Sequence, residues 1–376
     1  MKKTILIISI SVSIILSSFL FMSINEQITY SVDYPDSFET LIIDHNERKK
    51  TPDIYYIILD EYAGYDSLVQ NFGFDNNKFY DELSNKGFFV FEKSYSNYPN
   101  TVLSIPSSLN MQYLNFNEKD KISSNELLSQ IRFIEDNNLV MKNLSQNEYY
   151  IVSLFAGSEA IGSDEIIDEK LCGDNYYSSH ELSRIYPEER LKQKRIEILC
   201  SFEEIVHIKD RIKQPIFVYS HFSLPHDPFV FNEFGDLEIS HKEKLTHNEN
   251  KNAYLQQLKF SNTMILKTID EIQSDKNRNS VIIVQSDHGE RTGINWEEPT
   301  NDMIRQGLNN LNAIYLSNPS NDAIYEGITP VNSFRVVFNE YFDAEFELLE
   351  DRYFWMNSSE PPFKITDVTD IIELTG

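Results

Sequence analysis

The stretch Val281–Glu290, VIIVQSDHGE, constrains the fold more than any other part of the chain. Its apolar, β-branched start and the polar turn residues that follow predict a buried strand of a parallel sheet. Open α/β sheets bind their ligands just beyond the carboxyl ends of the strands. Asp287 and His288 stand at that position, and Gly289 allows the backbone to turn. A carboxylate beside an imidazole is half of a metal site; a solvated loop with Asp287 as a helix cap is the alternative that this stretch alone leaves open.

Apolar runs elsewhere predict the other strands of such a sheet. They cover Asp53–Leu59, Gly87–Phe91, Tyr149–Phe155, Pro215–Ser220 and Leu311–Leu316. Amphipathic periodicity predicts helices that alternate with these strands, at Asn76–Lys86, Glu188–Val206 and Lys251–Ile272. The alternation indicates an α/β fold with a doubly wound, mostly parallel sheet and helices on both faces.

The stretch Ser94–Leu114 places a threonine at the start of a helix-like pattern. Pro99 and Asn100 interrupt the chain before Thr101, and the apolar residues that follow are spaced to face a core. Proline is tolerated only in the first turn of a helix. The helix therefore either begins just before Pro106 or is kinked there, and the sequence leaves both possibilities open.

The overall composition is that of an acidic globular protein. The 376-residue chain contains 59 Asp and Glu against 33 Lys and Arg, and its formal net charge is −26. A nucleic-acid-binding protein needs a basic surface, so nucleic acid is not expected as a partner. With 41% hydrophobic and 13% aromatic residues, the chain has enough apolar content to build a large core.

The N-terminal residues predict a membrane anchor. Two lysines precede the uncharged apolar run Thr4–Ile24, which is about long enough to span a bilayer. We expect residues 1–24 to be an uncleaved transmembrane helix, with the remainder of the chain extracytoplasmic; a cleaved signal peptide is the alternative. Residues 25–50 are polar and aperiodic, as in a tether, and residues 51–376 are expected to form the folded domain.

The region 156–210 differs from the rest of that domain. It is rich in charged residues and shows no strand signal, so we expect an insertion or lid that lies over the sheet. It contains the two cysteines, Cys172 and Cys200, which would meet an oxidising environment after export and are able to pair there. Neither has another cysteine or a histidine at metal-ligand spacing, so a zinc knuckle is not expected.

Polar residues near the predicted strand ends suggest a shared site, and the candidates are Asp60, Thr101, His221, His226, Asp287 and His288. Two carboxylates, an imidazole and a hydroxyl form a four-ligand set for a divalent ion such as zinc or manganese. A threonine hydroxyl attacks poorly unless a metal lowers its pKa. The other imidazoles, or a second ion, would stabilise the charge that develops on an attacked phosphoryl group. In the simpler alternative, Asp60 and Thr101 cap helices and the histidines are ordinary loop residues.

Four motifs give the chain a resemblance to a known family. They are IILDEY, SNYPNTVLSIPSSLNMQYL, HFSLPHDPF and SDHGE. In combination they resemble the sulfatase-like hydrolases and transferases of the alkaline phosphatase superfamily, a group that includes lipoteichoic acid synthases and phosphoethanolamine transferases. The similarity runs over roughly Thr51 to Trp355, and it implies an alkaline-phosphatase-like fold.

The resemblance also implies roles for single residues. In the phosphoethanolamine transferases, the nucleophilic threonine is followed by two residues and then Ser-Val-Pro; here Thr101 is followed by Val-Leu-Ser-Ile-Pro, which implies that Thr101 is the nucleophile. The implied metal ligands are Asp60, Thr101, Asp287 and His288. Zinc or manganese is the expected ion, calcium or magnesium is the alternative, and one or two ions would bind. The loop motif implies that His221 and His226 contact the substrate or a second ion.

Departures from the family pattern bear on the substrate. True sulfatases carry Cys or Ser in a Cys-x-Pro-x-Arg context that is converted to formylglycine, and Thr101 cannot undergo this conversion. We therefore expect a phosphoester substrate, in a phospholipid head group or a surface glycan. Glu61 stands where relatives commonly have Gly, so it either supports Asp60 or competes with it for the ion. The alternatives are a sulfuric ester hydrolase and a catalytically inert surface-binding protein.

Overall fold

The centre of the fold is a seven-stranded sheet with the order β3-β11-β10-β2-β7-β5-β6. The computed structural model describes residues 28–32, 51–173, 187–240, 245–320, 323–359, 361 and 363–373. The strands of the sheet are β2 (Asp53–Leu59), β3 (Phe89–Val90), β5 (Tyr150–Leu154), β6 (Glu169–Leu171), β7 (Ile216–Phe222), β10 (Ser280–Ser286) and β11 (Asn312–Leu316). β10, β2, β7, β5 and β6 are parallel neighbours, whereas β11 pairs antiparallel with both β10 and β3. The predicted α/β fold with a mostly parallel sheet is confirmed.

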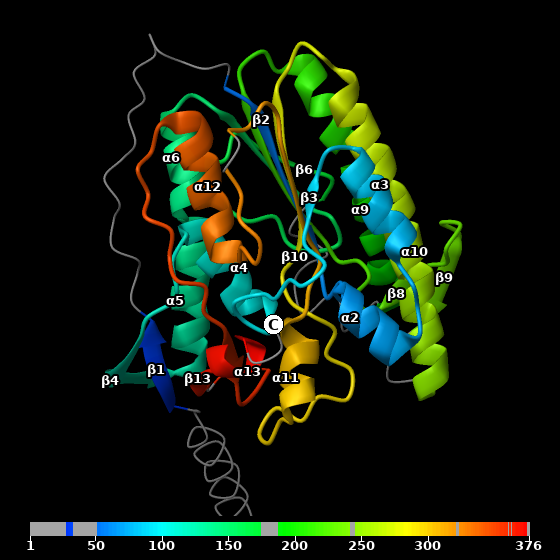
Figure 1. Ribbon diagram of the computed structural model, residues 1–376, viewed down its shortest axis with the longest axis vertical. Helices are drawn as coiled ribbons and strands as arrows, with labels where there is room; N and C mark the ends of the chain where they lie inside the picture. The colour runs from blue at the N-terminus through cyan, green and yellow to red at the C-terminus, as the bar shows by residue number, and fades with distance from the viewer. Residues whose placement is uncertain are drawn as a thin grey trace, which may run out of the picture.

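Helices cover both faces of this sheet (Figure 1). One face packs against α3 (Asn77–Asn85), α9 (Pro187–Arg211) and α10 (His247–Ser274). The other face packs against α4 (Thr101–Asn110), α6 (Leu139–Gln146) and α12 (Pro330–Phe342). Because successive strand residues point to opposite faces, β2 sends Tyr55 and Ile57 into the first core and Ile54 and Ile58 into the second. Burial of each such side chain stabilises the fold by about 1.5–3 kcal/mol. A shift of the strand by one residue would exchange the two sets of side chains between the faces, so this burial fixes the register of β2.

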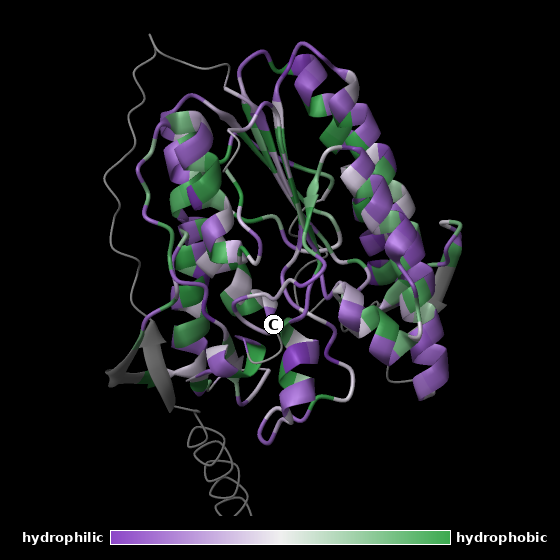
Figure 2. Ribbon diagram, in the orientation of Figure 1, coloured by the Kyte–Doolittle hydropathy of each residue, from purple (hydrophilic) through white to green (hydrophobic). Residues whose placement is uncertain are grey.

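The strand register aligns the carboxyl ends of three neighbouring strands. Leu59, at the end of β2, lies opposite Ser286 of β10 on one side and opposite Phe222 of β7 on the other. The residues that follow these strands therefore emerge together at one edge of the sheet, where α4, α11 and α2 also lie (Figure 1). Hydropathy colouring shows that the flanking helices carry both apolar and polar residues, as expected for helices packed on one side (Figure 2).

Smaller elements surround this edge. The helical ones are α2 (Tyr65–Ser67), the π-helix η1 (Leu68–Phe72), α5 (Ser124–Asp136), α11 (Asn301–Leu308) and α13 (Thr369–Glu373). Three two-stranded sheets pair β8 (Phe229–Phe231) with β9 (Leu237–Ser240), β12 (Phe354–Met356) with β13 (Ile365–Asp367), and β1 (Ile28–Val32) with β4 (Phe116–Ser123).

Two stretches differ from the sequence-based expectation. β6 lies within the region 156–210, where no strand was expected, because its three residues Glu-Lys-Leu pair at the sheet edge and carry no apolar pattern. β1 lies within residues 25–50, which were expected to be a tether; Ile28–Val32 instead pairs antiparallel with β4. Both short strands form through pairing with another strand, β6 with β5 and β1 with β4, and the local sequence pattern does not predict such pairing.

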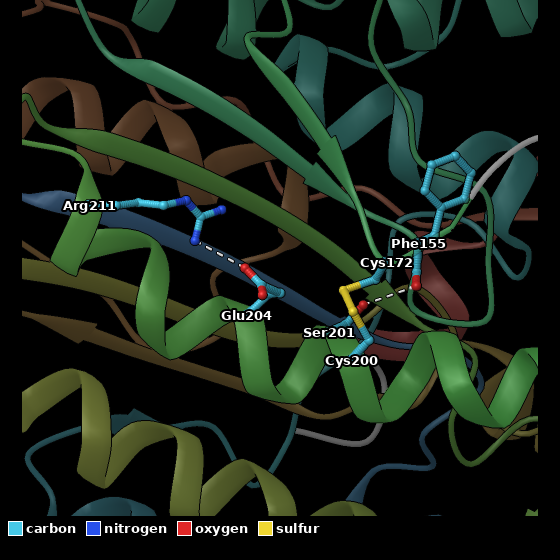
Figure 3. The surroundings of a disulfide bond; sticks show 6 residues. All are labelled: Phe155, Cys172, Cys200, Ser201, Glu204 and Arg211. Atoms are coloured by element: carbon cyan, nitrogen blue, oxygen red, sulfur yellow. Dashed lines mark hydrogen bonds and ion pairs between the residues drawn. A yellow bond between two sulfur atoms is a disulfide. The ribbon is translucent and has the colours of Figure 1, made fainter.

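Cys172 and Cys200 form a disulfide, as their expected export suggested. The bond ties the end of β6 to the middle of α9, and the adjacent Ser201 donates a hydrogen bond to the Phe155 carbonyl oxygen at 3.0 Å (Figure 3). The helix that carries Cys200 is thereby fixed both to the sheet edge and to the chain that leaves β5.

Among the residues that the structure describes, none belongs to a helix long and apolar enough to cross a membrane. The predicted anchor over residues 1–24 lies outside the described residues.

Candidate active site and metal centre

Asp60 and Glu61 follow β2 directly. The Asp60 backbone N–H donates to the Phe222 carbonyl oxygen at 3.0 Å, which extends the pairing of β2 with β7 by one residue. Glu61 adopts a left-handed backbone conformation with φ 60°, and its N–H donates to Asp287 Oδ1 at 3.2 Å. The turn thus directs the Asp60 side chain to the sheet edge and supports the carboxylate of Asp287.

Asp287 and His288 follow β10 in a turn with many hydrogen bonds. The Ser286 hydroxyl donates to the His288 carbonyl oxygen at 2.7 Å, and the His288 N–H donates to Asp287 Oδ1 at 3.0 Å. Gly289 is required because a Cβ there would lie 2.1 Å from the backbone oxygen of Gln306. Glycine at this position therefore allows the turn to pack directly against the end of α11.

Thr101 is the first residue of α4. Asn100 is the N-cap, and its side chain accepts the Leu103 N–H at 3.1 Å, so Thr101 is not the cap. The helix begins at Thr101 and continues through Pro106, so the possibility that it begins just before Pro106 is wrong. Freed from capping, the Thr101 hydroxyl donates to Asp287 Oδ2 at 2.6 Å and lies 3.3 Å from His288 Nε2.

His221 lies within β7 rather than after it, because this strand extends to Phe222. Its Nε2 is 3.9 Å from Asp60 Oδ2 and 3.8 Å from Asp287 Oδ2. The ligand atoms of Asp60, His221 and Asp287 all lie within 4.8 Å of one another. His288 Nε2 joins this group at 3.6 Å from Asp60 Oδ1 and 3.4 Å from Asp287 Oδ2.

The arrangement fits a divalent cation. Asp60 Oδ1 and His221 Nε2 are buried and have no hydrogen-bond partner among the residues that the structure describes, a costly state that a coordinated ion would relieve. His288 Nδ1 lies 2.8 Å from the Gly289 carbonyl oxygen. This contact assigns the proton to Nδ1 and leaves the Nε2 lone pair facing the carboxylates, the usual support of a metal-bound imidazole. Carboxylate, imidazole and hydroxyl donors suit zinc or manganese.

The electrostatics of the group agree with this assignment. Burial alone would raise the pKa of Asp287, but the His288 and His221 imidazoles and the Thr101 hydrogen bond together lower it. Burial, reinforced by the guanidinium of Arg291, lowers the pKa of His288. An ionised carboxylate and a neutral imidazole are the protonation states in which both side chains bind metals.

A second acidic group adjoins the first. The ligand atoms of Glu61, His226 and Asp227 lie within 4.8 Å of one another, and His226 Nε2 is 3.3 Å from Glu61 Oε2. Burial would lower the pKa of His226, but the carboxylates of Asp60, Glu61 and Asp227 outweigh it and raise the pKa. A cavity of about 250 Å³ opens beside this group, bordered in part by Glu61, Asp227, Tyr254, Glu290 and Gln306.

Two helices hold the loop that carries His226. Gln257 of α10 accepts the Val230 N–H at 2.8 Å and donates to the His226 carbonyl oxygen at 3.0 Å. Lys194 of α9, which is only 4% exposed, donates to the Pro228 carbonyl oxygen at 3.3 Å. Burial lowers the pKa of Lys194 to about 8, against the opposing effect of the Asp60 and Asp227 carboxylates.

The sulfatase family model matches residues 52–314, which is more than half of the chain. The chain belongs to the sulfatase family. No curated protein matches the chain in sequence.

Solved structures share the fold of this sulfatase-family chain. The C-terminal periplasmic domain of EptC from Escherichia coli, in complex with zinc, superposes with a TM-score of 0.56 at 11% identity; the match covers 88% of this chain and 96% of that one. The lipooligosaccharide phosphoethanolamine transferase A of Neisseria meningitidis gives 0.54 at 13% identity, over 87% and 60% of the two chains. An alkaline phosphatase superfamily protein from Vibrio parahaemolyticus gives 0.51 at 14% identity, over 89% and 84%.

The structure thus brings together all six residues singled out in the sequence, although in two adjoining groups. His221, expected to contact substrate, lies among the candidate metal ligands, whereas His226 belongs to the second group. Sequence reasoning missed Asp227, Lys194 and Arg291. Asp227 and Arg291 stand beside residues that were singled out, but the buried position of Lys194 has no local signal in the charged helix that carries it.

Proposed function

We propose that this sulfatase-family protein is an exported, metal-dependent enzyme that cleaves or transfers phosphoesters through a phosphorylated Thr101. The observation that carries the proposal is the position of the Thr101 hydroxyl, 2.6 Å from Asp287 Oδ2 and 3.3 Å from His288 Nε2 at the start of a helix. Asp60, Asp287, His288 and Thr101 would hold the ion, and the nearby Nε2 of His221 would join them. Zinc is favoured because zinc is present in the EptC structure.

In the first chemical step, the Thr101 Oγ1 forms a bond to phosphorus while the bond from phosphorus to the ester oxygen breaks. A bound divalent ion supplies Lewis acidity that lowers the pKa of the Thr101 hydroxyl and neutralises charge on the phosphoryl oxygens. The proton of Thr101 already points at the Asp287 carboxylate. The amino end of α4 carries a partial positive charge, which would stabilise the phosphate once it is attached to Thr101.

In the second step, water or an acceptor hydroxyl attacks the phosphorus and the bond to Thr101 Oγ1 breaks. His226 is suited to exchange protons with the departing and entering oxygens because it lies, half-buried, beside carboxylates that favour its protonated form. Water as the acceptor makes the protein a hydrolase, and an alcohol makes it a transferase.

The substrate is proposed to be a phosphoester in a phospholipid head group or a surface glycan. Support comes from the fold shared with a lipooligosaccharide phosphoethanolamine transferase and from the apolar run Thr4–Ile24, which would place the enzyme at a membrane. The disulfide between Cys172 and Cys200 supports an extracytoplasmic location for the catalytic domain, residues 51–376, because such bonds persist in oxidising compartments.

The test is the variant Thr101→Ala, assayed for hydrolysis of bis-p-nitrophenyl phosphate and for bound zinc by mass spectrometry. We expect turnover to fall to background while zinc remains bound through the other ligands. Thr263→Ala is the matched control, because Thr263 is an exposed residue of α10 whose hydroxyl donates to the Lys259 carbonyl oxygen at 3.1 Å; its turnover should equal that of the parent protein. Undiminished turnover by Thr101→Ala would place the nucleophile elsewhere.

The same preparation distinguishes a sulfuric ester hydrolase, which family membership alone would allow. Threonine at position 101 cannot become formylglycine, so p-nitrophenyl sulfate should be a far poorer substrate than the phosphodiester. Faster cleavage of the aryl sulfate would contradict the phosphoester assignment, and an ion-free protein inert to both esters would indicate a binding protein.

A further inference from the structure

The site holds more negative charge than one divalent ion can neutralise. Asp60, Glu61 and Asp287 are buried, and Asp227 lies beside them as part of the second group. One ion supplies two positive charges, while a phosphoryl group would bring at least one further negative charge. Further cations must therefore act on the substrate side of the site.

Arg291 is placed to be such a cation. Its Nη2 lies 3.4 Å from His226 Nε2, and its Nε lies 3.7 Å from Glu61 Oε1. The Arg291 side chain is 20% exposed, so it is largely withdrawn from bulk water but still accessible to a ligand.

Glu61 holds Arg291 at this position. The Arg291 backbone N–H donates to Glu61 Oε1 at 2.8 Å, and the Glu61 side chain is only 5% exposed. Glu61 has φ 60°, a left-handed backbone conformation. This conformation is strained for every residue except glycine. The Glu61 side chain at this strained position contacts both His226 and Arg291.

We infer that Arg291, oriented by Glu61, binds the non-bridging phosphoryl oxygens of the substrate and takes the place of a second metal ion. The inference rests on the proposed function. A guanidinium presents parallel N–H donors that match two phosphoryl oxygens, and it keeps its charge at any pH the protein would meet. His226, 3.4 Å away, lies beside the same phosphoryl group. The protein therefore works with one ion.

The competing arrangement is an ion bound by Glu61, His226 and Asp227. The Nδ1 of His226 contacts the Asp227 carbonyl oxygen, so such an ion would bind the Nε2, which faces the guanidinium of Arg291. A divalent cation at that position would meet the repulsion of Arg291 and, on the Asp227 side, of the buried Lys194. The two arrangements predict different zinc contents and different effects of the same substitutions.

The experiment compares the full-length, zinc-loaded parent protein with Arg291→Ala, Arg291→Lys and Glu61→Gly. Arg211→Ala is the control, because Arg211 is an arginine of α9 paired with Glu204 and Glu169 away from the site. Three quantities are measured: the Kd of inorganic phosphate by calorimetry, kcat and KM for bis-p-nitrophenyl phosphate, and zinc per chain.

We expect Arg291→Ala to weaken phosphate binding about 10- to 100-fold, as for the loss of hydrogen bonds to a charged group. Arg291→Lys should recover part of the affinity, and added guanidinium should restore part of the turnover of Arg291→Ala. Glu61→Gly removes the carboxylate together with the backbone strain, so it should bind phosphate more weakly without loss of thermal stability. Zinc should remain at one per chain in every variant.

Two results would overturn the inference. One is a phosphate Kd for Arg291→Ala equal to that of Arg211→Ala, and the other is two zinc ions in the parent that fall to one in Glu61→Gly. Failure of the proposed function gives a different pattern: phosphate binding that depends on Arg291, with no phosphoester turnover by the parent protein.

Discussion

Gln257 provides a quantitative test of how the fold positions the site. Its Oε1 accepts the N–H groups of Val230 and Phe231 at 2.8 and 3.3 Å, and its Nε2 donates to the carbonyl oxygens of Pro225 and His226 at 3.2 and 3.0 Å. The side chain is fully buried. A single amide therefore satisfies four backbone groups of the loop that carries His226.

The substitution Gln257→Leu removes all four hydrogen bonds at nearly constant side-chain volume. A buried N–H or carbonyl left without a partner costs about 1–3 kcal/mol, and the Val230 N–H is the shortest of the four contacts. We expect a total loss of about 3 kcal/mol in the free energy of unfolding, allowing for partial relaxation of the loop. Turnover should fall as well, because His226 loses the bond that holds its carbonyl oxygen.

The assay is chemical denaturation of the full-length protein in detergent, with Gln256→Leu as the matched control. Gln256 is the preceding residue of α10; it is half-buried and accepts one bond, from the Glu233 N–H at 3.0 Å. Loss of this hydrogen bond should lower the free energy of unfolding by about 1 kcal/mol or less. Equal stabilities of the two variants would refute the claim that the Gln257 amide secures the loop.

Three further predictions concern parts of the chain outside the reacting groups. Arg278→Met should lower the free energy of unfolding by about 3 kcal/mol, because the buried Asp53 carboxylate then loses its 2.5 and 2.6 Å hydrogen bonds from the guanidinium. Asp53 lies at the end of β2 opposite the site, so the zinc content should not change. The Cys172–Cys200 disulfide joins residues 28 positions apart, so its reduction should lower the free energy of unfolding by about 3–4 kcal/mol, as measured by chemical denaturation. An unchanged denaturation midpoint would contradict this prediction. Gly289→Ala should lower zinc affinity measured by calorimetry, since the new Cβ would lie 2.1 Å from a backbone oxygen of α11 and must displace His288; unaltered affinity would show that the turn can yield.

The central strands were predictable from sequence because they are buried on both faces. β2 and β10 are buried along their whole length and contain the apolar runs 54–59 and 281–284, and side chains in two cores fix their register. The positions of Asp60 and Asp287 after these strands then follow from the parallel pairing. The strand arrangement around the candidate site is therefore predictable from local sequence patterns.

Other features depend on contacts that no local pattern contains. β6 is a three-residue edge strand of mixed polarity, and the orientation of β11, antiparallel to its neighbours, is set by the chain path through α11. The contact of Arg291 with Glu61 joins residues 230 positions apart. Glu61 was recognised in sequence as a departure from the family pattern, but its partner could be identified only when the turn after β10 was seen beside the turn after β2.

Anomalous diffraction at the zinc edge, from crystals of the zinc-loaded protein, tests the proposed metal site most directly. We expect one peak per chain, about 2.0–2.2 Å from oxygen or nitrogen atoms of Asp60, Thr101, Asp287 and His288. A peak confined to Glu61, His226 and Asp227, or a Thr101 oxygen outside coordinating distance of the ion, would contradict this expectation.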